Sequence, residues 1–452
     1  MKKLLQQKKN SGLSQIQIIA LGFFLIIMAG TFLLMLPFSS KGQPASFLTA
    51  LFTATSATCV TGLVVVDTFC SWTLFGQLVI LCLIQVGGLG FVTIAVFFSI
   101  YIRRTISLRE RGLMQESVNT LQIAGVVRLA KLIVKGTFLF EGIGAILLAL
   151  CFVPRFGPAR GIYFGIFHSI SAFCNAGFDL MGEATGEYSS LVSYVGDPVV
   201  NLTIMTLIVI GGIGFVVWDD VRSKGLRFHR YKLQTKVVMT VTAILIFGSA
   251  LVFWLLERQH LMADMTVSEA VFASLFSSVT ARTAGFNTID TAALTPGSKL
   301  LTIVLMFIGG SPGSTAGGIK TTTIVVLIMY AISTLSNQSG CNVFDRRVPE
   351  DMVRKAGVVL ILNLGLAITA GVFICGLQPH VPLESVLFEV FSAIGTVGMS
   401  TGITRELGTA SRYIIIFLMY CGRIGSMTFA LSFTRRKNVN PVQLPVGHLP
   451  VG

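Results

Sequence analysis

Long stretches without a charged residue recur along the chain. A helix that crosses a membrane needs about 20 predominantly apolar residues. Stretches of this kind that hold no Asp, Glu, Lys or Arg are residues 10–40, 68–102, 198–218, 237–256, 300–319, 321–344 and 356–383. Two further apolar stretches, 132–153 and 413–434, surround Glu141 and Arg423. The pattern predicts an all-α integral membrane protein.

Shorter apolar segments lie between the long ones. Residues 45–58 and 384–394 are too short to span a bilayer, and each precedes a turn that contains glycine. Irregular backbone at membrane depth is tolerated only where protein buries it or where it lines a wet cavity, so we interpret these segments as re-entrant pore helices. A polar Gly-rich stretch also interrupts residues 300–344. Counting that region as one crossing made of two half-helices gives eight crossings.

Composition and charge agree with a membrane protein. Charged residues make up 12% of the chain, against about 25% in an ordinary soluble domain. The net charge is +14, and its placement is uneven. Twenty-four Lys or Arg and seven Asp or Glu lie in segments 1–9, 103–135, 219–236, 345–355 and 435–437. The positive-inside rule places these segments and both termini in the cytoplasm, so the charge sets orientation and nucleic acid is not an expected partner.

Four turns on the opposite side share one sequence pattern. They read Cys59-Val60-Thr61-Gly62-Leu63, Cys174-Asn175-Ala176-Gly177-Phe178, Arg282-Thr283-Ala284-Gly285-Phe286 and Gly395-Thr396-Val397-Gly398-Met399. Their central glycines are separated by 115, 108 and 113 residues. A large apolar residue stands ten positions before each glycine, at Phe52, Phe167, Leu275 and Phe388. Ser-Ala precedes three of the turns at one offset, as Ser56-Ala57, Ser171-Ala172 and Ser392-Ala393.

A glycine pair recurs in the apolar stretch after each turn. The pairs are Gly87-Gly88, Gly211-Gly212, Gly309-Gly310 and, with one exchange, Gly422-Arg423. Each unit therefore contains a long helix, a short helix, a glycine turn and a second long helix. Four such units around one axis would bury all four turns together.

The four turns are candidates for an ion filter. Rings of backbone carbonyls in T-V-G-type loops replace the hydration shell of K+, and Thr396-Val397-Gly398 is that tripeptide. Glycine reaches the backbone angles that such a loop needs without strain. Close packing is the alternative role of glycine in membrane helices, but it does not explain four similar turns at nearly regular spacing. The residues predicted to bind K+, the only metal ion expected, are Val60, Thr61, Gly62, Asn175, Ala176, Gly177, Thr283, Ala284, Gly285, Thr396, Val397 and Gly398.

The sequence GGSPGSTAGGIK, residues 309–320, predicts a gate. It lies between two half-helices on the cytoplasmic side of the turns, where a Gly-rich loop would obstruct ions. A nucleotide-binding loop G-x-x-x-x-G-K-[ST] is the alternative, but Ile319 intervenes before Lys320, and such loops follow a strand. The predicted gate residues are Gly309, Gly310, Ser311, Pro312, Gly313, Ser314, Thr315, Ala316, Gly317, Gly318, Lys320 and Arg423.

Cations in apolar surroundings need partners, because a charge at the bilayer centre costs about 2.5–3.5 kcal/mol on insertion scales. Arg423 is expected to donate hydrogen bonds to loop carbonyls and to raise the barrier to cations, with a packing role beside Glu141 as the alternative. Arg282 directly precedes a filter turn, and we expect Glu389 to neutralise it.

Other chemistry finds little support in the sequence. The eight Cys form no CxxC pair and the five His form no cluster, so neither a structural metal nor a disulfide is predicted. A membrane enzyme would need clustered His, Cys or carboxylates within the membrane stretches. A transporter that couples K+ to Na+ or H+ would need a second cation site, for which Glu141 and Asp179 are the candidates.

The motifs resemble those of the Trk/Ktr/HKT superfamily of potassium transporters, most closely its bacterial KtrB/KtrD-type membrane subunits. The residues that carry the resemblance are V-T-G-L, N-A-G-F, R-T-A-G-F-N, T-V-G-M, GGSPGSTAGGIK and GRIG. The resemblance implies four M1-P-M2 units, each a helix, a pore helix and a helix, around a pseudo-fourfold pore. The expected units are residues 1–104, 105–224, 225–340 and 341–437.

The resemblance also implies a function and partners. It implies channel-like K+ uptake across a bacterial plasma membrane; relatives with Ser at the position of Gly62 tend to pass sodium. It implies a homodimer in which residues 438–452 form a contact, although disorder is the alternative for that tail. A cytosolic KtrA/KtrC-like ring is expected to dock on the basic face and to bind ATP, ADP or NAD. The chain itself is expected to hold no covalent cofactor and to contact membrane lipid.

Overall fold

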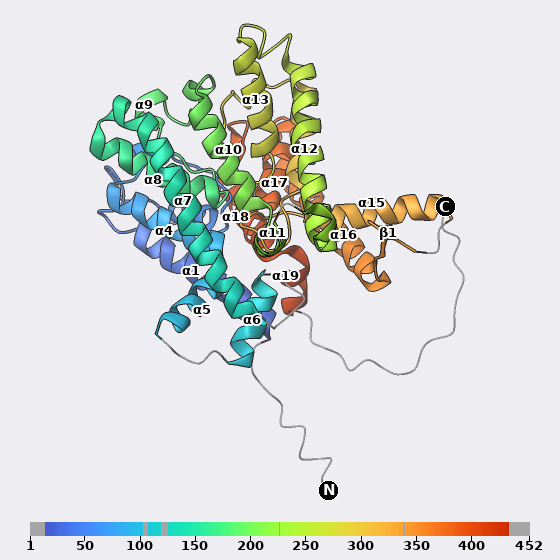
Figure 1. Cartoon of the computed structure of the whole chain (residues 1–452). Coiled ribbons are helices and arrows are strands. Elements are labelled where there is room, and N and C mark those ends of the chain that lie inside the picture. The colour runs from blue at the N-terminus through green and yellow to red at the C-terminus, as the bar shows by residue number, and fades with distance from the viewer. Residues whose placement is uncertain (1–13, 103–106, 119–124, 226, 338–339, 434–452) are drawn as a thin grey trace.

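The computed structural model describes residues 14–102, 107–118, 125–225, 227–337 and 340–433 (Figure 1). Some predicted features lie outside these residues: the cytoplasmic basic residues 2, 3, 8, 9, 103, 104 and 435–437, and the dimer contact of residues 438–452. The regular secondary-structure elements of the described residues are helices apart from one small hairpin, so the all-α prediction is confirmed.

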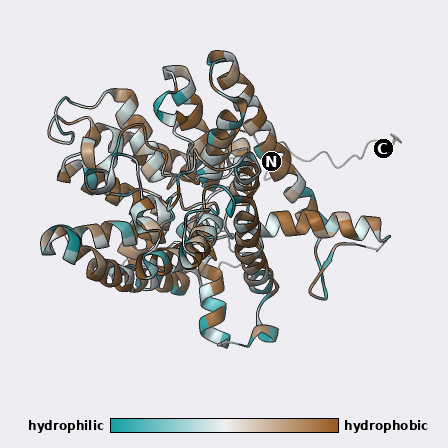
Figure 2. Ribbon diagram, turned by 90° about the horizontal axis from the view of Figure 1, so that it is seen from above, coloured by the Kyte–Doolittle hydropathy of each residue, from teal (hydrophilic) through white to brown (hydrophobic). Residues whose placement is uncertain are grey.

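Four long helices are apolar enough to cross a membrane. They are α1 (Gln15–Leu34), α7 (Val126–Phe156), α12 (Leu233–Glu257) and α16 (Glu350–Leu377). Large apolar side chains on these helices face outward, for example Leu150, Phe247 and Ile361, which are 68%, 68% and 70% exposed. Figure 2 shows hydrophobic residues along most of the helices and hydrophilic residues mainly at ends and loops. Such an exterior suits lipid and not water.

A shorter helix follows each long one. These helices are α2 (Phe47–Thr58), α8 (Pro158–Phe173), α13 (Val267–Thr280) and α17 (Leu383–Gly395). They contain 12 to 16 residues, fewer than the roughly 20 that a crossing needs. Their repeated apolar position is inside the protein, since Phe52, Phe167 and Phe388 are fully buried.

A pair of helices with a break between them comes next in each part of the chain. The first members are α4 (Leu74–Leu89), α10 (Pro198–Gly212), α14 (Pro296–Phe307) and α18 (Thr409–Ile424). The second members are α5 (Phe91–Tyr101), α11 (Phe215–Lys224), α15 (Thr321–Leu335) and α19 (Ser426–Phe433). In Figure 1, α15 extends sideways from the rest of the molecule.

The breaks correct one prediction. Residues 68–102 and 198–218 were expected as uninterrupted spans, but α4 and α5 meet at 90° and α10 and α11 at 95°. Gly90 (φ 77°), Gly214 (φ 97°) and Gly425 (φ 92°) stand at three of the breaks in conformations that do not continue a helix. An apolar run alone does not reveal such a bend, because both halves remain apolar.

The remaining elements are short or lie at the ends of the helices. They are α3 (Thr68–Ser71), α6 (Leu108–Val118), α9 (Gly182–Thr185), the 3-10 turns η1 (Val192–Tyr194), η2 (Phe228–Arg230) and η3 (Ile403–Arg405), and the hairpin β1 (Asn342–Val343) and β2 (Arg346–Arg347). The two strands are antiparallel, with Asn342 opposite Arg347. The buried core connects distant parts of the chain, since Ile27 and Phe52 share one cluster with Ile374 and Ile415.

Candidate functional site

The backbone takes one conformation at all four glycine turns. The central glycines have positive φ angles: 92° at Gly62, 67° at Gly177, 83° at Gly285 and 92° at Gly398. So do the residues two positions earlier: 56° at Val60, 59° at Asn175, 73° at Thr283 and 50° at Thr396. These four are not glycines, and a left-handed conformation costs such residues roughly 1–2 kcal/mol. Alternation of left- and right-handed residues directs successive carbonyls to one side, as a carbonyl-lined filter requires.

The four turns contact one another in cyclic order. A Cβ atom built on Gly177 would lie 2.6 Å from Ala284 O, and one built on Gly285 would lie 2.6 Å from Val397 O. A Cβ on Gly398 would collide with Thr61 O, and a Cβ on Gly62 would collide with the carbonyl oxygen of Ala176. Each glycine therefore faces a backbone carbonyl of the next turn, and the last turn meets the first. No side chain larger than hydrogen fits at these four positions without displacing the neighbouring turn.

Hydroxyl groups of the short helices hold the turns. Ser56 Oγ accepts a hydrogen bond from Gly62 N at 3.1 Å, and Ser392 Oγ accepts one from Gly398 N at the same distance. Ser171 Oγ donates to Phe178 O at 2.7 Å. These are the serines of the repeated Ser-Ala pair. The third turn lacks that pair, and the hydroxyl of Thr280 donates to Phe286 O at 2.6 Å.

We expect Ser56→Ala to weaken the first turn. The buried amide of Gly62 would lose its acceptor, which costs about 1–3 kcal/mol of unfolding free energy. Thr55→Val is the matched control on the same helix, because Thr55 Oγ1 is buried with no hydrogen-bond partner among the described residues. Thermal unfolding of the detergent-solubilised protein in K+ should separate the two variants. Equal midpoints for both would show that the serine does not hold the turn.

An open cavity of about 470 Å³ lies on one side of the turns, and all four central glycines line it. Its charged lining residues are Asp67, Asp179, Glu187, Asp290 and Arg405. The lining thus carries more acidic than basic side chains, and this excess attracts cations toward the turns. Asp67 also has a structural role, since its carboxylate accepts hydrogen bonds from Phe69 N at 2.9 Å and Tyr188 N at 3.1 Å.

The Gly-rich segment forms a closed loop between α14 and α15. A parallel bridge pairs Ile308 with Ile319 at its base. Lys320 Nζ donates to Ala316 O at 2.8 Å and to Gly317 O at 3.4 Å, so carbonyl dipoles of its own loop solvate this cation. A Cβ atom built on Gly309 would collide with Gly317 O. The start of the loop therefore lies too close to its end for any residue other than glycine.

The loop lies directly beneath the glycine turns. Thr315 Oγ1 donates to Phe173 O at 3.2 Å, at the C-terminal end of α8. A Cβ on Gly317 would collide with the side chain of Thr396, which belongs to the fourth turn. The other side of the loop contacts the break between α10 and α11. There Phe215 N donates a hydrogen bond to Gly313 O at 2.7 Å, and Ser311 N donates one to Gly212 O at 3.0 Å.

Arg423 joins the loop to the first inner helix. Its guanidinium donates through Nη1 to Thr315 O and through Nη2 to Gly87 O and, at 3.1 Å, to Gly88 O. The acceptors at Gly87 and Gly88 belong to the corresponding glycine pair of α4, which the sequence did not suggest. Hydrogen bonds from a charged donor contribute about 1.5–3 kcal/mol each, so Arg423 fixes the loop strongly.

A second cavity, of about 430 Å³, lies on the far side of the loop. Gly313, Ser314, Ala316, Gly318 and Lys320 of the loop line it together with Arg423, and none of the four turn glycines does. The order of features is therefore acidic cavity, glycine turns, loop with Arg423, and inner cavity. The glycine turns and the loop thus lie between the two cavities.

The predicted pair of Arg282 and Glu389 does not form between these two described residues. Arg282 Nη2 donates to Thr242 Oγ1 at 3.4 Å, on α12. The Glu389 carboxylate accepts hydrogen bonds from Thr404 Oγ1 and, at 2.8 Å, from Ser400 Oγ, and both hydroxyls lie in the segment after the fourth turn. The carboxylate thus holds the segment that follows the fourth turn, and the prediction was wrong because these two hydroxyl groups occupy the carboxylate.

Glu141, the alternative partner of Arg423, makes other contacts. Glu141 is buried and accepts a hydrogen bond from Gln85 Nε2 at 3.1 Å. Asp179, the other candidate for a second cation site, lines the outer cavity and accepts a bond from Met181 N at 3.0 Å. The two carboxylates therefore do not share one site: one lies beside α4, and the other lies above the turns.

Comparison with known proteins decides the family. The TrkH family, described as cation transport proteins, matches residues 7–440. The chain belongs to this family. The TrkH-family chain is 42% identical to the Ktr system potassium uptake protein B of Bacillus subtilis (strain 168) over 438 residues, 96% of each protein. It is 38% identical to the potassium/sodium uptake protein NtpJ of Enterococcus hirae over 444 residues, again 96% of each.

Its fold also matches a solved structure. The potassium transporter TrkH from Vibrio parahaemolyticus superposes with a TM-score of 0.74 at 18% identity, over 95% of this chain and 86% of the other. The sequence-based identification of the superfamily is therefore confirmed. This TrkH-family chain is a multi-pass membrane transporter and not an enzyme.

Proposed function

We propose that the chain forms a potassium-selective pore from four M1-P-M2 units around a pseudo-fourfold axis. The units are residues 1–104, 105–224, 225–340 and 341–437, with eight crossings and four re-entrant pore helices. The cyclic contact of the four glycine turns carries this proposal. Four separate packing glycines would have no reason to meet in order and to close on the first.

The carbonyls of the turns are the proposed ion ligands. They belong to the twelve residues of the filter, three from each turn, and only K+ is expected there. The C-terminal ends of α2, α8, α13 and α17 adjoin the turns. The negative ends of their helix dipoles favour a cation in the space between them. Carbonyl dipoles can replace the hydration shell of K+ only when they surround it, so a closed ring is needed.

The loop 309–320 and Arg423 are the proposed gate. The loop lies between the turns and the inner cavity, and the guanidinium adds positive charge on the same path. Both features oppose cation movement, the first by obstruction and the second by repulsion. A movement of the loop that broke the contacts of Thr315 with Phe173 and Arg423 would remove the obstruction and the repulsion together.

Channel-like K+ uptake into a bacterial cell is the function that this arrangement supports best. Three curated relatives are named Ktr system potassium uptake proteins. A Na+- or H+-coupled symporter is the alternative, and the name of the Enterococcus hirae relative includes sodium. A coupled mechanism needs a second cation site, and Glu141 is held by Gln85 within the helix packing.

The expected assembly follows from the family and from the charge distribution. We infer a homodimer in the plasma membrane with both termini in the cytoplasm, as the positive-inside rule requires. A cytosolic KtrA/KtrC-like ring would dock on the basic face and hold ATP, ADP or NAD. Two relatives are named as protein B and protein D of a Ktr system, which supports further subunits.

Uptake in cells tests the proposed function. A bacterial strain without its own K+ uptake systems should recover growth at limiting K+ when it expresses this chain with a regulatory subunit. Replacement of Na+ by choline should leave the K+ uptake rate unchanged if the pore acts as a channel. Uptake that stops without Na+ would favour the symporter, and no K+ uptake in either medium would contradict the proposal.

A further inference from the structure

A basic pocket lies at the end of α7, away from the ion path. It has a volume of about 380 Å³ and is lined by Arg128, Lys131, Leu132, Lys135, Asp219, Arg222 and Ser223. The first four belong to α7 and the last three to α11. Lys131 and Lys135 are exposed, four residues apart, and so lie on one face of the helix.

The charges in this pocket are not balanced. Asp219 is its one carboxylate, and it forms an ion pair of 3.0 Å with Arg128. In the described part of the chain, Lys131, Lys135 and Arg222 make no ion pair with a carboxylate. Three cations therefore remain available to an anion in one concave site, where a phosphate oxygen would meet several donors at once.

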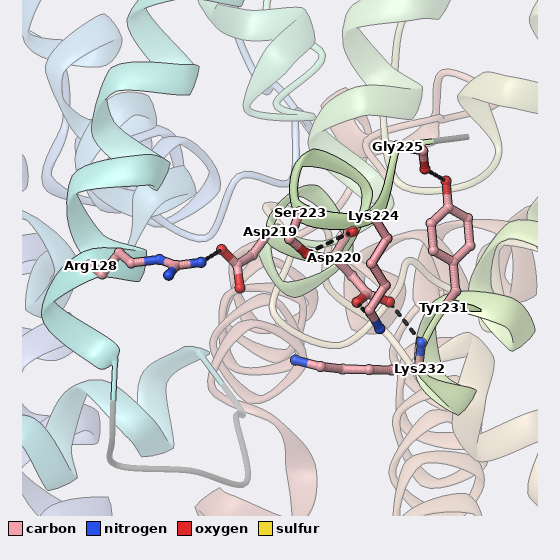
Figure 3. Close-up of polar contacts among 8 residues, drawn as sticks. All are labelled: Arg128, Asp219, Asp220, Ser223, Lys224, Gly225, Tyr231 and Lys232. Atoms are coloured by element: carbon pink, nitrogen blue, oxygen red, sulfur yellow. Dashed lines mark hydrogen bonds and ion pairs between the residues drawn. The ribbon is translucent and has the colours of Figure 1, made fainter. Parts of the chain in front are cut away.

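The wall formed by α11 is held in place. Figure 3 shows Asp220 beside Lys224 and Lys232, with Arg128 reaching Asp219 from α7. The buried carboxylate of Asp220 lies 2.7 Å from Lys224 Nζ and accepts a hydrogen bond of 2.8 Å from Lys232 N. On the other face, Trp218 Nε1 donates to Ile210 O at 3.0 Å. These contacts maintain the bend that brings α11 against α7, so the pocket is part of the fold and not a chance grouping of surface lysines.

The pocket is continuous with a lipid-facing surface. Phe138 and Leu139 follow Lys135 by one turn of α7 and are 63% and 59% exposed, and Ile146 and Leu150 extend the apolar face. Residues 136–156 would span about 30 Å as a helix, the thickness of the hydrocarbon core. Lys131 and Lys135 then lie at the level of the lipid headgroups, and acyl chains would contact Phe138 and Leu139.

We propose that this pocket binds the headgroup of an anionic phospholipid. Its phosphate accepts hydrogen bonds from Lys131, Lys135 and Arg222, while its acyl chains pack along the apolar face of α7. The apolar face favours a lipid over a soluble anion, because inorganic phosphate gains nothing from Phe138 and Leu139. It also favours a lipid over a cytosolic protein, since the pocket opens beside the membrane-facing part of the helix. Basic pockets between helices at the cytoplasmic boundary are a recognised form of lipid site.

Lipid binding by the full-length protein in detergent tests the proposal. Phosphatidylglycerol is titrated, and the protein with bound lipid is counted by native mass spectrometry. We expect Lys131→Gln with Lys135→Gln to weaken binding about 30-fold, equivalent to about 2 kcal/mol for two cations near the membrane surface. Arg227→Gln with Arg230→Gln is the matched control, because it removes two exposed charges outside the pocket and should leave the affinity unchanged. Lys131→Arg with Lys135→Arg should retain binding and shows that the pocket tolerates substitution.

Competition experiments and the contrary outcomes below distinguish a lipid from a free anion or a protein in the pocket. Phosphatidylcholine should not compete, and millimolar inorganic phosphate should not displace phosphatidylglycerol. Equal loss of binding in the pocket variant and in the control would show diffuse attraction and overturn the proposal. Displacement by inorganic phosphate would assign the pocket to a free anion. If the Lys131→Gln, Lys135→Gln variant bound lipid like the wild type but no longer bound a cytosolic regulatory protein, the pocket would be a protein docking site.

Discussion

Replacement of Arg423 by glutamine should increase K+ flux by at least about tenfold. The substitution removes the guanidinium that donates to Thr315 O, Gly87 O and Gly88 O, so the loop loses its connection to α4. It also removes a positive charge from the path between the turns and the inner cavity. A tenfold increase corresponds to a barrier lower by about 1.4 kcal/mol, less than one hydrogen bond from a charged donor contributes. Rubidium uptake into proteoliposomes at a fixed membrane potential measures the change.

Two further variants separate the causes. Arg423→Lys keeps the charge but cannot reach three carbonyls with a planar fork, so a flux between those of the wild type and Arg423→Gln would show that both charge and attachment contribute. Arg258→Gln removes an exposed arginine that stacks on Trp254 and should leave the flux unchanged. A folded Arg423→Gln protein with the flux of the wild type would exclude the guanidinium from the gate.

Replacement of Gly62 by serine should lower the preference for K+ over Na+ by about tenfold or more. The new Cβ would collide with Ala176 O, and the residue would also have to keep a φ of 92°. Relief of the collision requires the first and second turns to separate, which alters the distances between carbonyl oxygens around the ion. A filter that no longer fits K+ loses its advantage over the smaller ion, and about 1.4 kcal/mol of lost discrimination is a factor of ten.

Gly42 provides an unusually close control for this substitution. It has a φ of 89°, and a Cβ built on it meets nothing within 4 Å. Gly42→Ser therefore imposes the same backbone strain without touching a neighbouring turn, and its K+/Na+ preference should equal that of the wild type. Equal preferences in all three proteins would mean that the glycine turns do not select the ion.

The sequence was most informative where the backbone itself restricts the residue type. Gly62, Gly177, Gly285 and Gly398 each need a positive φ and contact a neighbouring carbonyl, and these two requirements leave glycine at nearly regular intervals. The composition of residues 309–320 indicated the loop for a similar reason, because a segment that folds back among other backbones has little room for side chains. Local requirements of this kind can be read from one sequence.

Contacts between distant side chains could not be predicted in the same way. Glu389 was assigned to Arg282 by charge alone, whereas Ser400 and Thr404 reach the carboxylate first. The bends of the first two inner helices were also missed, although Gly90 and Gly214 stand at the same position two residues after their glycine pairs. Hydropathy records only whether a residue is apolar, so a third glycine was the one available sign of a break.

The reversal potential of the reconstituted protein tests the central claim, that four glycine turns form a K+-selective path. The protein is placed in a planar bilayer with a high K+ concentration on one side and a low K+ concentration together with Na+ on the other, and Na+ is then replaced by choline. We expect the current to reverse near the K+ equilibrium potential and to persist in choline. Reversal near zero, or a current that disappears without Na+, would contradict the account.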